Sequence, residues 1–194
     1  MTGSTASDDD AGARCFLALL PDAATRALLV RGREGLERAT SGAARGMHWI
    51  EPEALHLTLR FLGTSGSAQI DYLARTLPTL AGGLPAFAAR RYGVWPNRAR
   101  PRLLVLELEA DPTLSALARA CEAHARTAGY AADQREFRAH VTLARLRPGC
   151  AFGILPKPPA SIGFDAVALM QSNPARSAAS YRELARVPLP RAGA

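Results

Sequence analysis

One short pattern occurs twice in this sequence and constrains the fold more than any other feature. It consists of a histidine, an apolar residue, a threonine and a leucine, and is written HLTL from His56 and HVTL from His140. Both copies lie in segments with the alternation of a β-strand, 56–62 and 137–146, and each follows a helical segment and a loop. We interpret the repeat as an internal duplication, in which two similar halves each contribute one strand to a shared cleft.

The remaining segments predict a chain that mixes helices and strands. Asp22 and the pair Asp111-Pro112 are typical of helix N-termini. The expected helices span 23–40, 68–80 and 112–128, and further strands are expected at 14–20, 47–50, 86–94, 103–108, 164–170 and 181–187. Several strands follow one another without a helix between them, which argues against a doubly wound parallel sheet. The pattern favours an α+β fold with antiparallel sheets and helices packed outside.

The strand period determines which side chains of the repeat share a face. Residues two apart point the same way, so each histidine is expected beside the threonine of its own motif, Thr58 or Thr142. The simple alternation also places Arg60 with His56, Phe61 with Leu57 and Leu59, and Ala144 with His140. Two such strands side by side would put two imidazoles and two hydroxyls into one groove.

Two imidazoles in one groove suit acid–base catalysis. Histidine titrates near neutrality, so one ring can accept a proton while the other donates one. A single strand histidine is more often structural than catalytic, but two of the four histidines fall in the same short pattern.

A zinc site is the other alternative. Zinc needs three or four ligands, and neither motif contains an Asp or Glu or forms metal-ligand spacing with His48 or His124. We therefore expect no metal and no cofactor.

Composition narrows the partners and the compartment. The formal net charge of +7 favours anionic partners such as nucleic acid, although an arginine-rich, alanine-rich chain also arises from genome composition. Three cysteines without a CxxC pair argue against a disulfide framework and fit a reducing cytoplasm. No apolar run is long enough to span a membrane, and the acidic N-terminus lacks the features of a signal peptide. Residues 1–13 are expected to be a disordered lead-in.

With these motifs in place, the sequence resembles a known superfamily, the 2H phosphoesterases. More narrowly, it is similar to the bacterial and archaeal RNA 2′,3′-cyclic phosphodiesterases, historically called 2′-5′ RNA ligases. The resemblance runs from about Arg14 to Val187 and is carried by RCFLALLP from Arg14, HWIEPEALHLTLRFLG from His48 and FRAHVTLARL from Phe137. It implies one bilobal domain over 14–190, with two pseudo-symmetric lobes whose antiparallel sheets line a central cleft. It also implies hydrolysis of RNA 2′,3′-cyclic phosphates to 2′-phosphates and a weak, reversible 2′-5′ ligation.

The same resemblance implies roles for individual residues. His56 would be the proton donor to the departing ribose 3′-oxygen, and His140 the proton acceptor that activates water. The strand period of the motifs itself suggests that Thr58 and Thr142 donate to non-bridging oxygens or fix the imidazoles. Arg145, five residues after His140, would contact the phosphate. Because Arg145 has the opposite parity to His140, the strand must bulge or end before it. Where relatives often have a tryptophan after Pro101-Arg102, this sequence has Val105, and Trp95 is a candidate replacement.

Two other functions remain open at this point. The same cleft would suit a 2H phosphodiesterase that acts on a small cyclic nucleotide, or a non-catalytic module that binds nucleotide or RNA. The expected partner is RNA with a 2′,3′-cyclic phosphate end. We expect no membrane association, a monomer, and a role in holding the RNA strand for the basic segment 96–101, predicted as a loop, with Arg98, Arg100 and Arg102.

Overall fold

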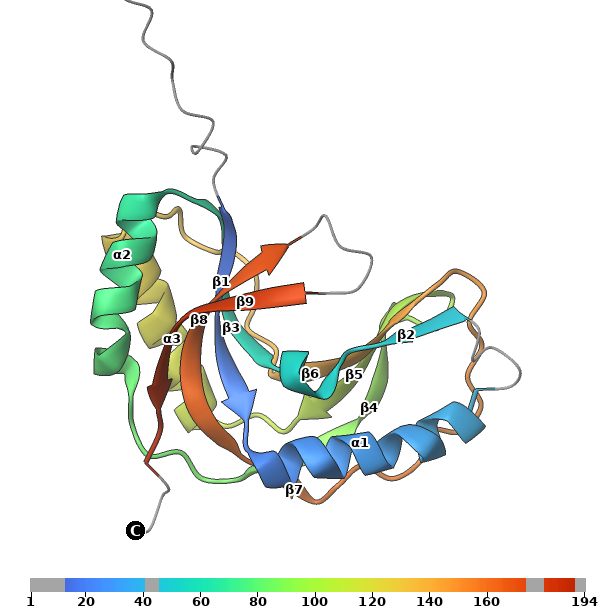
Figure 1. The fold of residues 1–194 in the computed structure, drawn as a ribbon. Coiled ribbons are helices and arrows are strands. Elements are labelled where there is room, and N and C mark those ends of the chain that lie inside the picture. Colours follow the sequence, from blue (N-terminus) through green and yellow to red (C-terminus); the bar gives the residue numbers. More distant parts are fainter. Residues whose placement is uncertain (1–12, 41–45, 174–179, 191–194) are drawn as a thin grey trace, which may run out of the picture.

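A computed structural model describes residues 13–40, 46–173 and 180–190, and within them the chain forms nine strands, three α-helices and two short 3-10 helices (Figure 1). In chain order these are β1 (Ala13–Pro21), α1 (Ala23–Arg38), β2 (Met47–Trp49), η3 (Pro52–Ala54), β3 (Leu57–Ser65), α2 (Ser67–Thr76), η4 (Leu77–Leu80), β4 (Phe87–Asn97), β5 (Arg100–Leu108), α3 (Pro112–Thr127), β6 (His140–Leu146), β7 (Ser161–Ile162), β8 (Phe164–Asn173) and β9 (Ser180–Pro188). The expected α+β class is confirmed. The expected lead-in, 1–13, lies outside the described residues except for Ala13, which already belongs to β1.

The strands form one antiparallel sheet whose order shows the duplication. The order is β7-β4-β5-β6-β3-β1-β8-β9, and β2 pairs with β6. The strands β3 and β6, which follow or begin at the two histidines, are neighbours at the centre, joined by the pair Leu57–Val141. Each of these residues directly follows its histidine, so the pairing relates the halves by an approximate two-fold axis. The predicted pair of similar halves is therefore present as two halves of a single sheet.

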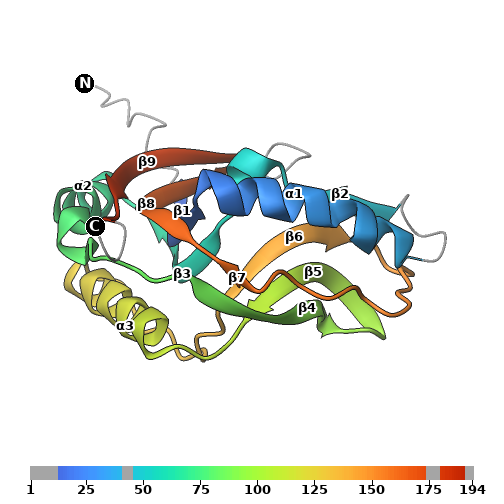
Figure 2. The ribbon, with the colours of Figure 1, turned by 90° about the horizontal axis from the view of Figure 1, so that it is seen from below.

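Helix caps and packing follow the sequence closely. The Asp22 carboxylate accepts from the Thr25 backbone N–H at 2.7 Å, and the Asp111 carboxylate accepts from Thr113 N–H at 2.7 Å, so both expected N-caps are confirmed. Helix α1 lies beside the half of the sheet that contains β2, β4, β5 and β6, and α2 and α3 lie beside the other half (Figures 1 and 2). Gly32 allows the close approach of α1 to β4, since a Cβ there would lie 3.1 Å from the Tyr92 hydroxyl.

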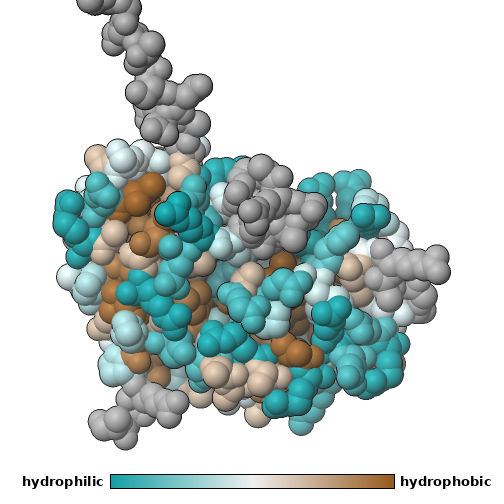
Figure 3. Space-filling model, viewed as in Figure 1, coloured by the Kyte–Doolittle hydropathy of each residue, from teal (hydrophilic) through white to brown (hydrophobic). Residues whose placement is uncertain are grey.

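The first half of the sheet consists of β3, β1, β8 and β9. Its central strands, β1 and β8, are apolar on both faces. Cys15, Leu17 and Leu19 of β1 join the main core under the helices. The alternate residues of β1 and β8 form a second buried cluster on the opposite face: Phe16, Ala18, Leu20, Ala166, Ala168 and Met170. Burial on both faces explains why 14–20 is a continuous apolar run rather than an alternating one. Most of the surface seen in Figure 3 is hydrophilic, with smaller apolar areas over the half that carries α2 and near the centre.

Each central strand contains a β-bulge at the third residue after its histidine. In β3, Thr58 pairs with Ala18 and Arg60 with Leu17, which leaves Leu59 without a partner on β1. In β6, Thr142 pairs with Val105 and Ala144 with Leu104, which leaves Leu143 without a partner on β5. The two bulges occupy equivalent positions, so the duplication extends to an irregularity of the backbone.

The bulges overturn part of the simple alternation. Arg60 and Ala144 were expected on the histidine face, but both are buried on the core side. Phe61 was expected beside Leu57 and Leu59, but it is 49% exposed and lies 6.2 Å, between ring centroids, from Phe16 in the second cluster. One extra residue reverses the parity of the residues that follow it, up to the next irregularity of the strand. Of the two possibilities for Arg145, a bulge in the strand or a strand end before it, the structure shows the bulge.

The segment 96–101 is a second correction. It was predicted to be a loop, but β4 continues to Asn97 and β5 begins at Arg100, so only Arg98 and Ala99 form the turn. The Asn97 side chain accepts from the Arg100 backbone N–H at 2.9 Å and holds this turn closed.

Arg60, displaced into the core by the bulge, is the most connected buried charge in the first half. It is 8% exposed and donates to the Glu122 carboxylate of α3 and to two backbone carbonyls, those of Phe61 and Ala131. Asp133 lies 3.7 Å away. One side chain thereby ties β3 to α3 and to the segment that leads into β6.

Replacing Arg60 by alanine should lower the free energy of unfolding substantially. The change leaves the partly buried Glu122 carboxylate and two carbonyls without their donor, which costs about 3 kcal/mol, measurable by urea unfolding. The control is Arg38→Ala, which removes the exposed ion pair with Glu34 and should change the free energy by less than about 0.5 kcal/mol. Equal effects of the two substitutions would contradict the structural role of Arg60.

Candidate active site

His56 is held between the 3-10 helix η3 and strand β3, against aromatic rings. Its Nδ1 lies 2.8 Å from the carbonyl oxygen of Ala54. The imidazole centroid lies 4.8 Å from the ring of Phe16 and 4.9 Å from the ring of Tyr181 on β9, the latter edge-on. The surroundings of this histidine are therefore largely apolar.

His140 begins β6 and is held in the same way by different neighbours. Its Nδ1 lies 2.7 Å from the carbonyl oxygen of Arg138, and its ring centroid lies 4.4 Å from the ring of Trp95 on β4. In both halves, the carbonyl of the residue two positions earlier holds the imidazole.

This shared contact fixes the tautomer of both rings. A backbone carbonyl only accepts hydrogen bonds, so Nδ1 of each histidine must carry a proton. In the neutral ring the lone pair is then on Nε2, and in the charged ring the second proton is there. Each histidine therefore presents Nε2 as the atom that can accept or donate a proton.

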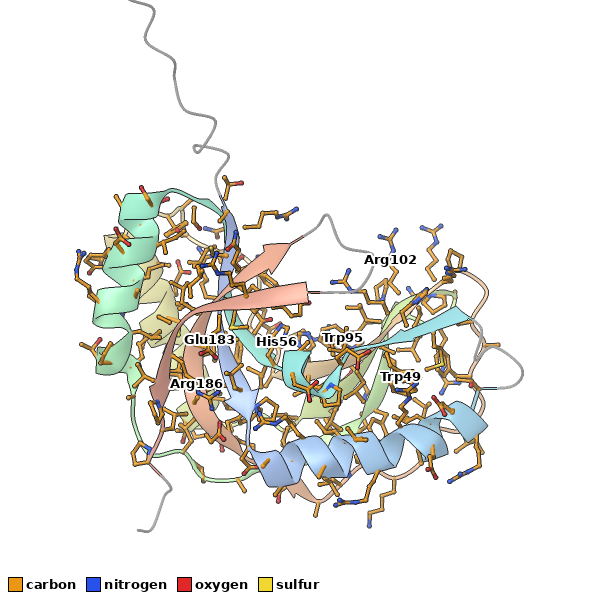
Figure 4. The ribbon with its side chains drawn as sticks, in the orientation of Figure 1. Trp49, His56, Trp95, Arg102, Glu183 and Arg186 are labelled. Atoms are coloured by element: carbon orange, nitrogen blue, oxygen red, sulfur yellow. The ribbon has the colours of Figure 1, made fainter. Side chains whose placement is uncertain are left out.

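The central strand pairing brings the two motifs together. In antiparallel register around Leu57–Val141, His56 is placed towards Thr142 and His140 towards Thr58. Thr58 and His140 line the same cleft. Figure 4 shows His56 and Trp95, the ring against which His140 rests, between the two halves of the molecule.

Burial favours the neutral form of both histidines. For His56, burial lowers the pKa below the ordinary 6.5, the hydrogen bond to Ala54 opposes this, and the charges of His140 and Arg145 lower it further. For His140, burial again lowers the pKa, and the charge of the Arg138 guanidinium lowers it further. The hydrogen bond to the Arg138 carbonyl and the charge of Glu107 raise the pKa and partly offset this.

Arg145 lies on the histidine face because of the bulge in β6. It is exposed and pairs across the sheet with His48 of β2 and Leu103 of β5. Its charge acts on His56, which belongs to the other half. The guanidinium is thus available to an anion held between the two histidines.

A buried carboxylate supports the neighbours of His140. Glu107 is 5% exposed and accepts from Trp95 Nε1 at 2.7 Å and from Arg91 Nε at 2.9 Å, with an Arg138 nitrogen at 4.0 Å. Burial alone would raise its pKa, but the donors Arg91 and Trp95 and the charges of Arg91 and Arg138 lower it overall. Gly93 is required beside it, since a Cβ there would lie 2.5 Å from a Glu107 oxygen.

The cleft continues outward from His140 as a cavity of about 570 Å³. It is bounded by strands β3 and β4, by helix α3 and by the segment before β6. Its lining residues are Thr58, Leu59, Arg60, Phe61, Trp95, Ser115, Ala118, Arg119, Glu122, Asp133, Arg135, Glu136, Phe137, Arg138 and His140.

The structure brings most of the predicted site residues together, but not the basic hairpin. Arg98 is occupied by the carbonyls of Phe152 and Gly153, at 2.8 and 3.2 Å, and Arg102 lies towards the tip of the β4–β5 hairpin (Figure 4). His124 hydrogen-bonds to Thr79 at 2.8 Å on the helical side.

Sequence reasoning missed three neighbours of the histidines: Phe16, Tyr181 and Glu107. Only Glu107 carries a signal in the sequence, as a carboxylate inside the apolar strand LLVLELE. A charge in such a run is expected to be paired. Phe16 and Tyr181 look like ordinary strand aromatics until the tertiary structure places them against His56.

Two absences hold within the described residues, 13–40, 46–173 and 180–190. No group of three or more His, Cys, Asp or Glu side chains in those ranges has an arrangement that would hold a metal ion. None of the helices found there combines the length and the apolar character needed to cross a bilayer.

Comparison with known proteins identifies the fold and the family. Residues 20–105 match the family described as LigT like Phosphoesterase. Escherichia coli LigT, solved in complex with 3′-AMP, superposes with a TM-score of 0.71 over 92% of this chain and 98% of its own, at 25% identity. Residues 20–105 of this chain belong to a LigT-like phosphoesterase domain, and the fold around them is that of LigT.

Two curated relatives of this chain have the same printed name, RNA 2′,3′-cyclic phosphodiesterase. The Bacillus subtilis protein is 32% identical over 99 residues, which are 50% of this chain and 54% of that protein. The Methanothermobacter thermautotrophicus protein is 28% identical over 136 residues, 69% of this chain and 71% of that protein. The chain thus spans about half the length of the first of these relatives.

The lowered pKa values predict how His56 and His140 titrate. Both imidazoles should protonate at a pH below the ordinary 6.5. Because the unfolded chain takes up these protons first, their contribution to stability is present above pH 6.5 and is lost as the pH falls through the lower folded values. Histidine NMR resonances and urea unfolding between pH 4 and 8 would measure both effects. A titration midpoint at or above pH 6.5 for either imidazole would contradict the lowering of its pKa by burial.

Proposed function

We propose that this phosphoesterase hydrolyses RNA 2′,3′-cyclic phosphate ends to 2′-phosphates by acid–base catalysis with His56 and His140. The observation that carries the proposal is the paired geometry: two imidazoles on one face, each held through Nδ1 so that Nε2 is free. The names of the curated relatives support the choice of substrate.

The proposed step needs one acid and one base on opposite sides of phosphorus. His140 Nε2 takes a proton from water as the water oxygen bonds to phosphorus. The bond from phosphorus to the ribose 3′-oxygen breaks, and protonated His56 donates its Nε2 proton to that oxygen. The product keeps the phosphate on the 2′-oxygen. A weak 2′-5′ ligation is the same step with an RNA 5′-hydroxyl in place of water.

The remaining site residues stabilise the charge that develops on the phosphate. Arg145 offers a planar pair of donors to two non-bridging oxygens, an arrangement that lysine lacks. Thr58 and Thr142 lie on the same face and supply hydroxyl donors, or hold the imidazoles. These groups are all side chains of the protein, so the proposed step uses no metal and no cofactor.

The same proposal includes the domain organisation, the oligomeric state and the compartment of the enzyme. Residues 14–190 would act as one bilobal domain, as a monomer in the cytoplasm, on RNA ends and without membrane association. The three free, buried cysteines fit a reducing compartment.

The first test is an assay on an oligonucleotide that ends in a 2′,3′-cyclic phosphate, in excess EDTA. We expect hydrolysis to continue and the product to carry a 2′-phosphate. The pH dependence of kcat/KM should be bell-shaped and centred below 6.5, because burial lowers the pKa of both histidines. Loss of activity in EDTA that zinc or manganese restores would rule out the metal-free step. A 3′-phosphate product would reverse the choice of leaving oxygen.

Histidine variants in the same assay test the division of labour. Each change, His56→Ala or His140→Ala, should lower turnover by about 10²–10⁴, and the double variant should lose much less than the product of both. With a leaving group that needs no proton, the His56 variant should recover and the His140 variant should not. Recovery of the His140 variant instead would exchange the roles. Native turnover in either single variant would end the proposal.

Arg145→Ala should lower turnover by about 10²–10³, the size expected for losing a donor to a charge that develops in the transition state. Arg145→Lys should recover only part of this, because lysine cannot bind two oxygens in the same planar geometry. Arg38→Ala on α1 is a control for the loss of one exposed positive charge and should leave turnover unchanged. An unchanged rate in Arg145→Ala would place this arginine outside the phosphate site.

A further inference from the structure

A buried carboxylate that the proposed chemistry does not use lies beside His140 on the neighbouring strand. Glu107 of β5 is the cross-strand partner of His140, and Arg91 of β4 is the cross-strand partner of Glu107. Cross-strand partners share a face of the sheet, with their Cβ atoms about 5 Å apart. Arg91, Glu107 and His140 therefore form one row across three strands, with the carboxylate between the guanidinium and the imidazole.

The other half of the sheet has a leucine at the position equivalent to Glu107. In the second half, Glu107 follows the β5 residue that pairs with Val141. In the first half, Leu20 follows the β1 residue that pairs with Leu57. Both side chains are buried, Glu107 at 5% and Leu20 at 7% exposed. An apolar side chain on the His56 side thus takes the place of the carboxylate, so the charge is a difference between the halves and not a product of the duplicated backbone.

Both oxygens of Glu107 hold groups that surround the His140 ring. Trp95 Nε1 donates to one oxygen at 2.7 Å, and Arg91 Nε donates to the other at 2.9 Å. The Trp95 ring lies 4.4 Å from the imidazole, between centroids, and the Arg138 guanidinium lies 4.1 Å from the centre of the Trp95 ring. Arg138 also supplies the carbonyl that accepts from Nδ1 of His140. The carboxylate therefore reaches the imidazole through the groups that fix its orientation.

The charge of Glu107 favours the form of His140 that the proposed step creates. When Nε2 accepts a proton the ring becomes a cation, which a fixed negative charge on the next strand stabilises. Burial lowers the pKa of His140 and the Arg138 guanidinium lowers it further, whereas the Glu107 charge raises it. The charges that act on His56 are those of His140 and Arg145, both positive. The two imidazoles therefore lie in fields of different sign.

We propose that Glu107 is a positioning residue for His140, which holds Trp95 and Arg138 around the imidazole and supplies the negative charge beside the ring as it accepts a proton. The inference rests on the proposed function, in which His140 activates water. Glu107 is nearly inaccessible, so it acts through its neighbours and not on the substrate. With donors on both oxygens it stays a carboxylate throughout the step, and the proton taken from water remains on His140 Nε2.

The test is Glu107→Gln, which removes the charge but keeps the shape of the side chain and an acceptor for Trp95 Nε1. We expect kcat to fall by roughly 10- to 100-fold, a part of the 10²–10⁴ that a general base contributes. KM should change little, because the side chain does not contact the substrate. The NMR titration midpoint of His140 should move to lower pH, and that of His56 should move less. The matched control is Glu109→Gln, which removes an exposed carboxylate just after β5 and should leave kcat and both midpoints unchanged.

Two further variants separate positioning from a purely structural role. Arg91→Gln breaks the same ion pair from its exposed side, where the arginine side chain is 59% exposed, and leaves the carboxylate in place. It should lower kcat less than Glu107→Gln does, and it should not move the His140 midpoint to lower pH. Glu107→Asp keeps the charge but draws the oxygens back from Trp95 and Arg138, so kcat should fall severalfold while the midpoint stays closer to native. If Glu107→Gln does not fold, Glu107→Asp decides, and native kcat in that variant would overturn the inference.

The NMR titration needs no substrate and therefore separates this inference from the proposed function. If the native protein hydrolyses no cyclic phosphate, the proposed function fails, and the His140 midpoint alone decides the role of Glu107. A midpoint that does not move to lower pH in Glu107→Gln would overturn the inference whatever the turnover. Where the native protein does hydrolyse the substrate, native kcat in Glu107→Gln, or an equal loss in Arg91→Gln, would also overturn it and leave the two-histidine step standing.

Discussion

The pairing of Leu57 with Val141 is the contact on which the rest of this structure depends. It joins two similar half-sheets into one and sets the approximate two-fold axis between them. Since each residue directly follows a motif histidine, the axis passes between the two imidazoles. Any other register would separate them or turn one towards the core, because a shift of one residue exchanges the faces of a strand.

The symmetry of the backbone contrasts with the asymmetry of the surroundings. Both histidines use a carbonyl two residues earlier, and both strands bulge at the third residue after the histidine. Yet His56 rests on Phe16 and Tyr181, whereas His140 rests on Trp95 with Arg138 and Glu107 close by. Equivalent backbones with different neighbours agree with the opposite proton-transfer roles that we propose for the two histidines. The fold supplies the geometry, and divergence of the halves supplies the difference.

Two buried charges stabilise the parts of the site that strands alone would leave loose. Arg60 anchors the segment leading to β6 from the first half, and Glu107 holds Trp95 and Arg138 from the second. Each is nearly inaccessible and each has several hydrogen-bond partners, which is the condition under which a buried charge is tolerated. Ion pairs of Arg60 and Glu107 therefore hold the segments on either side of the cleft, and the Leu57–Val141 backbone pairing holds the strands between them.

The sequence by itself determined the α+β class, the helix caps at Asp22 and Asp111, and the two histidine motifs at the starts of strands. These are local properties, since capping, strand period and repetition act over a few residues. It also required a bulge or a strand end before Arg145, but it did not predict the equivalent bulge before Phe61, because nothing in the motif alone shows the partner strand. Only the tertiary structure decided that Phe61 faces the cleft while Arg60 is buried, and that Arg98 is occupied by backbone carbonyls. It alone placed Phe16, Tyr181 and Glu107 beside the histidines. Those outcomes depend on register and packing between segments distant in the chain, and a strand pattern carries no information about its partner.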